Sequence, residues 1–387
     1  MTALALGTAS ACKLDTVTTS LGEDGVVVHG VLNPEAPDEL ILVEKILTGR
    51  VEIPDTLHFD PAEPILSGGG VPEENAVVTV QDLTTGESGT ALEDRLFLSS
   101  GKGAGVYRIV NGPKPTFPQP GDPAERHLPV LRSHRYRLTI RTAAGRVVTA
   151  ETLVPVAIAA VTYTSPVPFD RDTDTLRLAW TPATQAARYL FRITTPLGPF
   201  TFFTDSAGVA VPGTLQNIFA PAIPFVFTPG FEQDVSIAAV DTNYYDYYRS
   251  ASDPFTGSGR ISHVSGGSGV FGSYVQMVFR PLDVTATVDE PVEGRWINTT
   301  SIGWPPSLRL WVDQRIQGVA VLTGNYPDPY GGTHDGVIGR LTGSAISLAF
   351  LGGQVANDTS MTISGTFRGD SLILGPTAAP VIYVKAP

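Results

Sequence analysis

The sequence predicts an all-β protein: two antiparallel β-sandwiches followed by an up-and-down β-barrel of about eight strands. Gly and Pro are abundant, 40 and 32 in 387 residues, without a glycine at every third position, so the chain has many turns and is not a collagen. Short segments alternate apolar and polar residues with period two, which is typical of strands that cover a core on one face. Region 291–387 repeats this pattern with no helical periodicity between its segments.

The composition limits the classes of partner and of site. The formal net charge is −12, which disfavours binding to nucleic acid because an acidic surface repels phosphate. Cys12 is the one cysteine of the sequence, so the chain forms no internal disulfide and no thiolate metal cluster. No stretch reaches the roughly 18 apolar residues that a spanning helix needs.

The first residues, MTALALGTASAC, resemble the end of a bacterial lipoprotein signal, in which an apolar stretch and small residues precede a cysteine that becomes lipidated. We therefore expect residues 1–11 to be a signal remnant and Cys12 to carry the acyl chains that anchor the protein in a membrane. Three features depart from the pattern: no Lys or Arg precedes the apolar stretch, the stretch is short, and Ala9 stands where Leu is usual. The alternative is an unstructured N-terminus with an accidental cysteine.

Residues 12–158 are predicted to form the N-terminal sandwich. In HRYRLTIRT, three apolar residues at alternate positions face one way (Tyr136, Leu138 and Ile140), and arginines and threonine face the other. The order of strands and turns, including Thr85-Gly86 and Gly105-Val106-Tyr107, is similar to transthyretin-like sandwiches.

Residues 159–280 are predicted to form a second sandwich with a Tyr/Gly-rich C-terminal extension. The segment DTLRLAWTPATQAARYLFRIT resembles two strands of a fibronectin type III domain, with Trp180 as the core tryptophan and Tyr189 pointing inward. Gln233 stands where the resemblance implies a corner tyrosine, which puts the corner hydrogen bond in doubt.

Residues 291–387 are predicted to form the barrel, which closes a sheet on itself and leaves no exposed edge. Gly294-Arg295-Trp296 resembles the opening of lipocalin- and avidin-like barrels, and the resemblance implies that a basic residue of the last strand, here Lys385, lies on Trp296. The expected strands are 294–299, 307–314, 317–326, 335–343, 344–351, 359–367, 370–375 and 379–385.

The search for catalytic and metal motifs gives no strong candidate. The sequence has no G-x-S-x-G, H-E-x-x-H, P-loop or EF-hand motif, so we expect a protein that is not an enzyme and has no cofactor. Asp170, Asp172 and Asp174 alternate and would converge on a hard cation if the backbone curled, but no glycine permits that curl and a solvated linker is the simpler interpretation.

Four tyrosines crowd into five positions, Tyr244, Tyr245, Tyr247 and Tyr248, just before a glycine-rich run. We expect a strand here, with tyrosines on both faces. An exposed tyrosine cluster suits recognition of a glycan or a protein, whereas the structural alternative is a set of rings that cover apolar surface. The glycines, Gly266, Gly267 and Gly269, would permit positive φ and close backbone approach around Phe271.

DTNYYDYYRSASDPF followed by HVSGGSGVFGSY resembles the C-terminal signature of a family of Gram-negative outer-membrane lipoproteins of unknown function, over about residues 12–279. The resemblance implies a lipidated cysteine, an outer-membrane location, and a role beside TonB-dependent receptors. It leaves the barrel as an appended domain.

We therefore expect a lipid-anchored binding or accessory protein of the cell envelope. The first alternative is a small-ligand binder that uses the barrel as a lipocalin- or avidin-like cup, and the second is a hydrolase with an unrecognised site. The residues that would line the mouth of the cup are Trp304, Trp311, Tyr326 and Tyr330.

Overall fold

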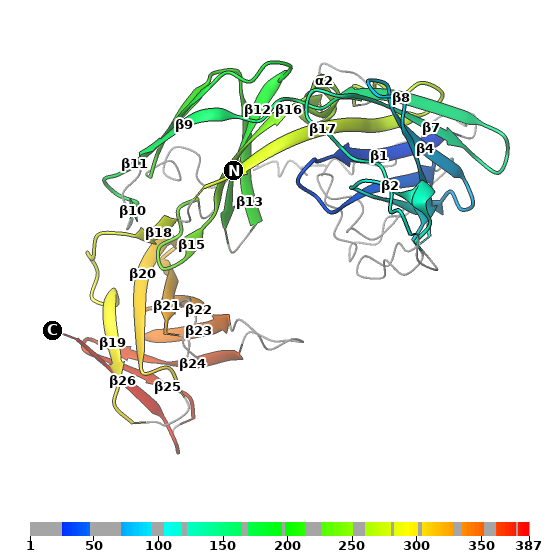
Figure 1. The fold of residues 1–387 in the computed structure, drawn as a ribbon. Coiled ribbons are helices and arrows are strands. Elements are labelled where there is room, and N and C mark those ends of the chain that lie inside the picture. The colour runs from blue at the N-terminus through cyan, green and yellow to red at the C-terminus, as the bar shows by residue number, and fades with distance from the viewer. Residues whose placement is uncertain are drawn as a thin grey trace, which may run out of the picture. The chain divides into compact units, whose positions relative to one another are not determined.

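The computed structural model is nearly all β, as the sequence predicts (Figure 1). It describes residues 25–46, 71–94, 104–117, 122–164, 169–195, 198–213, 226–250, 260–279, 282–300, 304–327, 335–351, 361–376 and 378–386. The chain forms two compact units: residues 1–155 with 240–274, and residues 156–239 with 275–387. The segment 240–274, which was expected to extend the second sandwich, therefore belongs to the first unit.

The first unit is a β-sandwich in which the hydrogen-bonded strand order is β17-β1-β2-β6-β5-β4-β7-β8, with β3 beside β2. β5 takes part in both layers because its first residues pair with β4 and its last two pair with β6. The strands are β1 (Val26–Leu32), β2 (Asp38–Lys45), β3 (Val71–Pro72), β4 (Val77–Asp82), β5 (Ser88–Glu93), β6 (Val106–Val110), β7 (Arg135–Arg141), β8 (Val147–Leu153) and the first part of β17 (Ser268–Val278).

Alternate residues of these strands build the core of the first unit. Tyr136, Leu138 and Ile140 on β7 are fully buried, whereas the three arginines of this strand are exposed, so the period-two prediction for this strand is confirmed. The parallel pairing of β1 with β17, from Val27 opposite Ser268 to Leu32 opposite Ser273, brings the glycine-rich run against the first strand.

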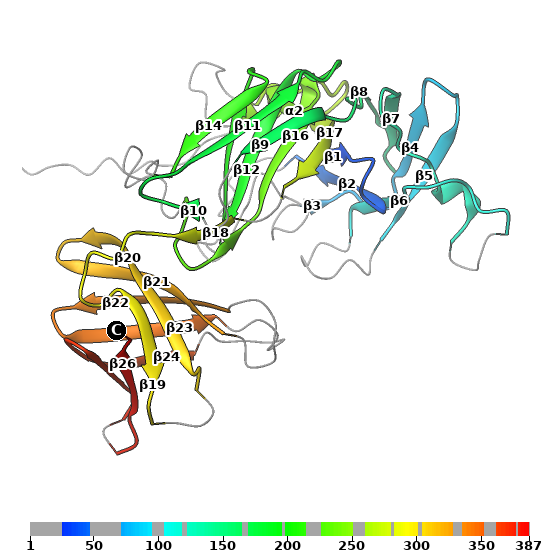
Figure 2. The same ribbon diagram turned by 60° about the vertical axis from the view of Figure 1, so that its left-hand side comes forward.

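The second unit begins with a sandwich whose earlier strands are green in Figure 2 and whose last strand is yellow. Its strands are β9 (Ala159–Thr164), β10 (Phe169–Asp170), β11 (Thr175–Thr181), β12 (Arg188–Thr195), β13 (Gly198–Thr204), β14 (Gly208–Pro212), β15 (Glu232–Gln233), β16 (Val235–Val240) and β18 (Leu282–Thr285). Trp180 and Tyr189 meet edge to face in its core with ring centroids 5.0 Å apart.

Gln233 replaces the missing corner tyrosine as a hydrogen-bonding group. Its side chain is fully buried, its Oε1 accepts a hydrogen bond from the Phe227 amide (3.2 Å), and its Nε2 donates to the Thr228 carbonyl (3.3 Å). Both partners lie five or six residues upstream, so a side-chain amide secures the backbone that a tyrosine hydroxyl secures in related sandwiches.

The second unit ends in a closed, antiparallel, eight-stranded barrel, which confirms the predicted architecture. Its strands are β19 (Gly294–Asn298), β20 (Ser307–Ile316), β21 (Val319–Tyr326), β22 (Asp335–Thr342), β23 (Ala345–Leu351), β24 (Met361–Arg368), β25 (Ser371–Leu374) and β26 (Val381–Lys385). β19 pairs with β26 to close the ring, and Trp296 is opposite Lys385 in that register. The Lys385 ammonium lies 5.9 Å from the centre of the Trp296 ring, the contact that the barrel resemblance implies.

A buried ion pair fixes β20 to the loop after β10. The Arg171 guanidinium donates to the Asp313 carboxylate (3.2 Å) and to the Val312 carbonyl, and both charged side chains are buried. Burial raises the pKa of Asp313 to about 6, although the charge of Arg171 acts to lower it. Removing either side chain alone would leave the other buried without this partner and would destabilise the fold.

Candidate binding surface on the tyrosine helix

The tyrosine cluster lies on an α-helix, α2 (Thr242–Arg249), so the expectation of a strand at this segment was wrong. Asp241 is its N-cap: the backbone there is extended, and Oδ1 accepts a hydrogen bond from the Tyr244 amide at 2.9 Å. At the other end, the Ser250 hydroxyl donates to the Asp246 carbonyl at 2.7 Å. These local bonds favour a helix over an extended strand, and the aspartate just before the run was the signal that could have shown it.

Helical spacing places Tyr244 and Tyr248, four residues apart, on one face. Their ring centroids are 4.4 Å apart, and Tyr247 meets Tyr248 edge to face at 5.3 Å. Tyr274 of β17 continues the row, 6.1 Å from Tyr244. The four tyrosines of α2 are all partly exposed, since the helix buries none of its residues completely.

Three further residues lie against these rings: the buried His29 of β1, Arg249 of α2 itself, and Arg260. His29 of β1 lies beside Tyr247 and Tyr248, and its Nε2 is 3.3 Å from the Tyr248 hydroxyl. Arg249 lies over the Tyr245 ring at 5.3 Å and Arg260 over the Tyr247 ring at 4.6 Å. Nothing in the sequence places His29 and Arg260 at this surface, because they are distant from α2 along the chain.

A buried polar network holds α2 in place. The Asp241 carboxylate accepts from the Thr152 hydroxyl (2.7 Å) and from the Ser273 amide (3.1 Å), as well as from Tyr244. The Asn243 side-chain amide donates to the carbonyls of Glu151 and Phe271. Burial raises the pKa of Asp241, and the hydrogen bonds it accepts act in the opposite direction. The helix is thus tied to both β8 and β17.

The glycine-rich run lets β17 approach its neighbours at backbone distance. Gly266 and Gly269 have φ of +78° and +115°, and a Cβ on Gly269 would lie 1.9 Å from the Val28 carbonyl oxygen. A Cβ on Gly272 would meet the Tyr244 amide nitrogen at 2.9 Å, so the absence of a side chain there allows α2 to sit on the strand. Phe271 is buried between them, with an exposed fraction of 1%.

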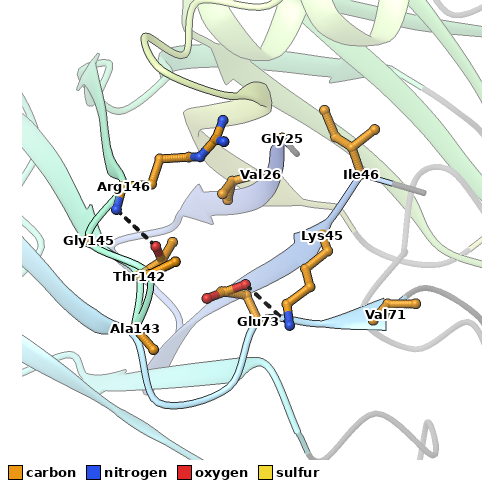
Figure 3. Close-up of a pocket in the computed structure, with 11 residues that line it drawn as sticks. Gly25, Val26, Lys45, Ile46, Val71, Glu73, Thr142, Ala143, Gly145 and Arg146 are labelled. Carbon is orange, nitrogen blue, oxygen red and sulfur yellow. Dashed lines mark hydrogen bonds and ion pairs between the residues drawn. The ribbon is translucent and has the colours of Figure 1, made fainter. Parts of the chain in front are cut away.

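The first unit also has an open depression of about 910 Å³, which Figure 3 shows in close-up. Its wall carries the Lys45 ammonium, 3.8 Å from the buried Glu73 carboxylate, and Arg146, whose amide donates to the Thr142 hydroxyl at 3.1 Å. Ile46 and Val71 contribute exposed apolar surface. These residues come from separate strands and a hairpin turn, so no local motif indicated them.

The predicted mouth residues of the barrel are distributed differently from the expectation. Trp304 and Tyr326 both pack edge to face on Phe350, with centroids 5.7 and 5.4 Å away. Trp311 is buried and donates to the Ala286 carbonyl at 3.1 Å, against the preceding segment. Tyr330 lies outside the described residues, as does Cys12.

The described side chains that point into the barrel form one apolar cluster, which gives the cup hypothesis no support. Its buried members include Trp296, Leu310, Leu322, Leu348, Leu372 and Tyr383.

The three alternating aspartates act as turn acceptors. Asp174 accepts from the Asp170 amide (2.7 Å), Asp170 accepts from the Asp172 amide (2.8 Å), and Asp172 accepts from the Thr287 amide (2.8 Å). In the part of the chain that the structure describes, no group of His, Cys, Asp or Glu is arranged to hold a metal ion. Nor does any helix among the described residues have the length and apolar character to cross a membrane.

Comparisons with known proteins give one informative match. No curated protein matches the chain. The similar solved structures include one of a 1.5-MDa bacterial ice-binding adhesin (9% identity, TM-score 0.16, 89% of this chain and 97% of that chain). Another is a Ca²⁺-stabilised, ice-binding adhesin of an Antarctic bacterium (9%, 0.17, 94% and 91%), and a third is a tetra-tandem repeat of a large adhesion protein (12%, 0.17, 90% and 75%). At these TM-scores the likeness carries no argument. Residues 13–279 match the family described as "Domain of unknown function (DUF4249)", and the chain belongs to this family.

Proposed function

We propose that the protein is a non-enzymatic binding or accessory protein of the cell envelope, and that the tyrosine surface of α2 engages its partner. The observation that carries the proposal is the combination of four partly exposed tyrosines with a helix anchored by a buried carboxylate. Tyrosine supplies a large contact area with few rotatable bonds, and anchoring the helix reduces the entropy lost on binding.

The groups around the rings fit a partner that offers flat surface with hydroxyl or carbonyl groups. The arginines over Tyr245 and Tyr247 can donate hydrogen bonds to such groups, and the buried His29 packs against Tyr247 and Tyr248. A glycan stacked on the rings, or the surface of a receptor, meets these requirements. Net charge of −12 disfavours nucleic acid.

A lipid anchor at Cys12 and a place beside a TonB-dependent receptor at the outer membrane complete the proposal. The support for the anchor is the TASAC stretch, and the support for the location and the receptor is the lipoprotein resemblance described above. An anchored binding protein meets its partner at a high local concentration, which suits a surface of modest area.

Co-purification from native membranes in mild detergent tests the proposal. Wild type should remain in the membrane fraction and bring down a TonB-type receptor, whereas Cys12→Ser should be soluble and alone. If both variants are soluble and bring down no partner, the proposal of a membrane-anchored envelope protein is wrong.

A second candidate function, the binding of a small amphipathic ligand, is favoured by the depression of the first unit rather than by the barrel. Lys45, Arg146 and the apolar Ile46 and Val71 offer both charge and apolar contact there. A thermal-shift screen of small amphipathic acids against wild type and Arg146→Ala tests it. A ligand that stabilises wild type alone supports this function, and one that stabilises both equally does not.

A further inference from the structure

Two arginines face each other on neighbouring strands of the barrel. Arg295 of β19 and Arg309 of β20 are direct partners in the antiparallel register, and Asn325 of β21 is the partner of Arg309 on its other side. Both arginines are exposed: Arg295 precedes the buried Trp296, and Arg309 lies between the buried Leu308 and Leu310, so the row Arg295–Arg309–Asn325 runs across the outer wall.

The two facing arginines destabilise the barrel unless a negatively charged group neutralises them. Like charges directly opposite each other on a sheet destabilise it, because the two Cβ atoms are only about 5 Å apart. Among the described residues, neither Arg295 nor Arg309 forms an ion pair with an acidic side chain within 4.0 Å, although the chain carries an excess of acidic residues. Arg309 instead lies over the Trp311 ring at 5.6 Å, which restricts where its guanidinium points.

The arginines line a depression of about 220 Å³ that also has hydrogen-bonding groups. Asn325 contributes an amide, Ser307 a hydroxyl, and Asp283 a carboxylate. The formal charge of the three ionised groups is +1, since Asp283 offsets one arginine. A ligand that places a single carboxylate in the depression would complete the balance, with any second carboxylate of the ligand left in solvent, whereas a phosphate dianion would place both of its charges beside Asp283.

We propose that this depression is a binding site for a carboxylate group, which the two guanidiniums receive and Asn325 and Ser307 orient. A planar carboxylate matches the fork of a guanidinium and accepts two parallel hydrogen bonds from it. The volume suits a small carboxylic acid or the acidic end of a peptide, and is below the roughly 300 Å³ or more that is typical of sites for larger ligands.

Isothermal titration of the full chain with succinate at constant ionic strength tests the site, with inorganic phosphate and an acidic C-terminal peptide as further probes. Succinate should bind to wild type, and Arg295→Gln and Arg309→Gln should each weaken binding about tenfold. Arg340→Gln is the matched control, because Arg340 is an exposed arginine of the same barrel outside this depression. Tighter binding of the peptide than of succinate would identify the source as a protein.

Thermal unfolding without ligand gives an independent readout. Removing one of two facing charges should raise Tm by about 1 °C in Arg295→Gln, which is the opposite of what loss of a structural contact would do. The same variant should lose the stabilisation that succinate gives wild type. Three results would overturn the proposal: no binding of succinate or peptide, equal binding by Arg340→Gln and the two site variants, or a preference for phosphate over carboxylates.

Discussion

The first unit and the barrel of the second unit close their sheets by different means. In the first unit, β17 lies against β1 at backbone distance, and a capped helix is held by the hydrogen bonds that Asp241 accepts and Asn243 donates. In the barrel, strands close around apolar side chains such as Trp296 and Leu322. The first unit depends on glycines that have no side chain and on polar side chains that are hydrogen-bonded. The barrel depends on apolar side chains that fill its interior.

This difference explains what the sequence could reveal. Side-chain filling imposes a period of two, so the barrel strands were predicted almost to the residue: 307–314 against Ser307–Ile316, and 335–343 against Asp335–Thr342. The burial of Tyr189 followed from the same pattern, and that of Trp180 from the resemblance to a fibronectin type III domain.

Closure through the backbone leaves no such pattern. The parallel pairing of Val27 with Ser268 joins distant parts of the chain, and nothing local encodes it. The helix was missed because tyrosine is common in strands, whereas the cap that favours the helix is a single residue, Asp241. His29 and Arg260 could not be assigned to the tyrosine surface because they are distant from α2 along the chain.

The largest effect on the free energy of unfolding is expected at the buried ion pair of the second unit. This pair tests whether apolar packing alone accounts for the stability of that unit. Asp313→Ala leaves the buried Arg171 charge without its buried partner, with the partly exposed Asp172 carboxylate (3.3 Å) remaining, and should cost about 3–5 kcal/mol in the free energy of unfolding. The double variant Arg171→Met/Asp313→Leu should be within about 1 kcal/mol of wild type or more stable. Chemical denaturation measures both, and a double variant as unstable as Asp313→Ala would contradict this account.

The next effect tests closure at backbone distance in the first unit. Gly269→Ala places a Cβ against the Val28 carbonyl at positive φ and should cost about 3 kcal/mol or more. Gly86→Ala is the control, because Gly86 also has positive φ (+85°) but a Cβ there would meet no atom within 4 Å, so a loss of about 1 kcal/mol is expected. Equal losses of stability in the two variants, measured by thermal unfolding, would show that the close approach of β17 to β1 does not require a glycine.

Removal of the helix anchor should have a smaller effect. Asp241→Ala leaves the Thr152 hydroxyl and the Tyr244 and Ser273 amides without their acceptor and should cost about 2 kcal/mol. Asp241→Asn keeps a cap oxygen and should lose less than half as much. Hydrogen exchange at α2 and β17 should rise in the alanine variant, and unchanged protection there would refute the anchoring role.

The smallest effect is a pH dependence of opposite sign in the two units. The folded-state pKa of Asp313, about 6, is above its ordinary 3.8, so ionisation disfavours the fold. On acidification from pH 7 to 5, wild type should gain about 1 kcal/mol relative to Arg171→Met/Asp313→Leu.

In the first unit, burial acts to raise the pKa of Asp82, but hydrogen bonds from His134 and nearby amides lower it overall. That contribution to stability is present above pH 3.8 and is lost as the pH falls below it through the lower folded-state pKa. Denaturation of wild type and His134→Ala across pH 2–7 measures the difference, which should shrink in acid. A difference that grows as the pH falls would contradict the assignment.

Binding of a partner by the tyrosine surface is the central claim, and capture from solubilised native membranes on immobilised protein tests it most directly. Tyr245→Ser/Tyr247→Ser alters the surface without touching the Asp241 anchor, and Phe117→Ser is the matched control because Phe117 is an exposed aromatic (81%) of the same unit. We predict that wild type and Phe117→Ser capture the same membrane partner and that the double tyrosine variant, folded by circular dichroism, captures at least about tenfold less. Equal capture by all three proteins would contradict the claim and would mean that the tyrosines only cover apolar surface.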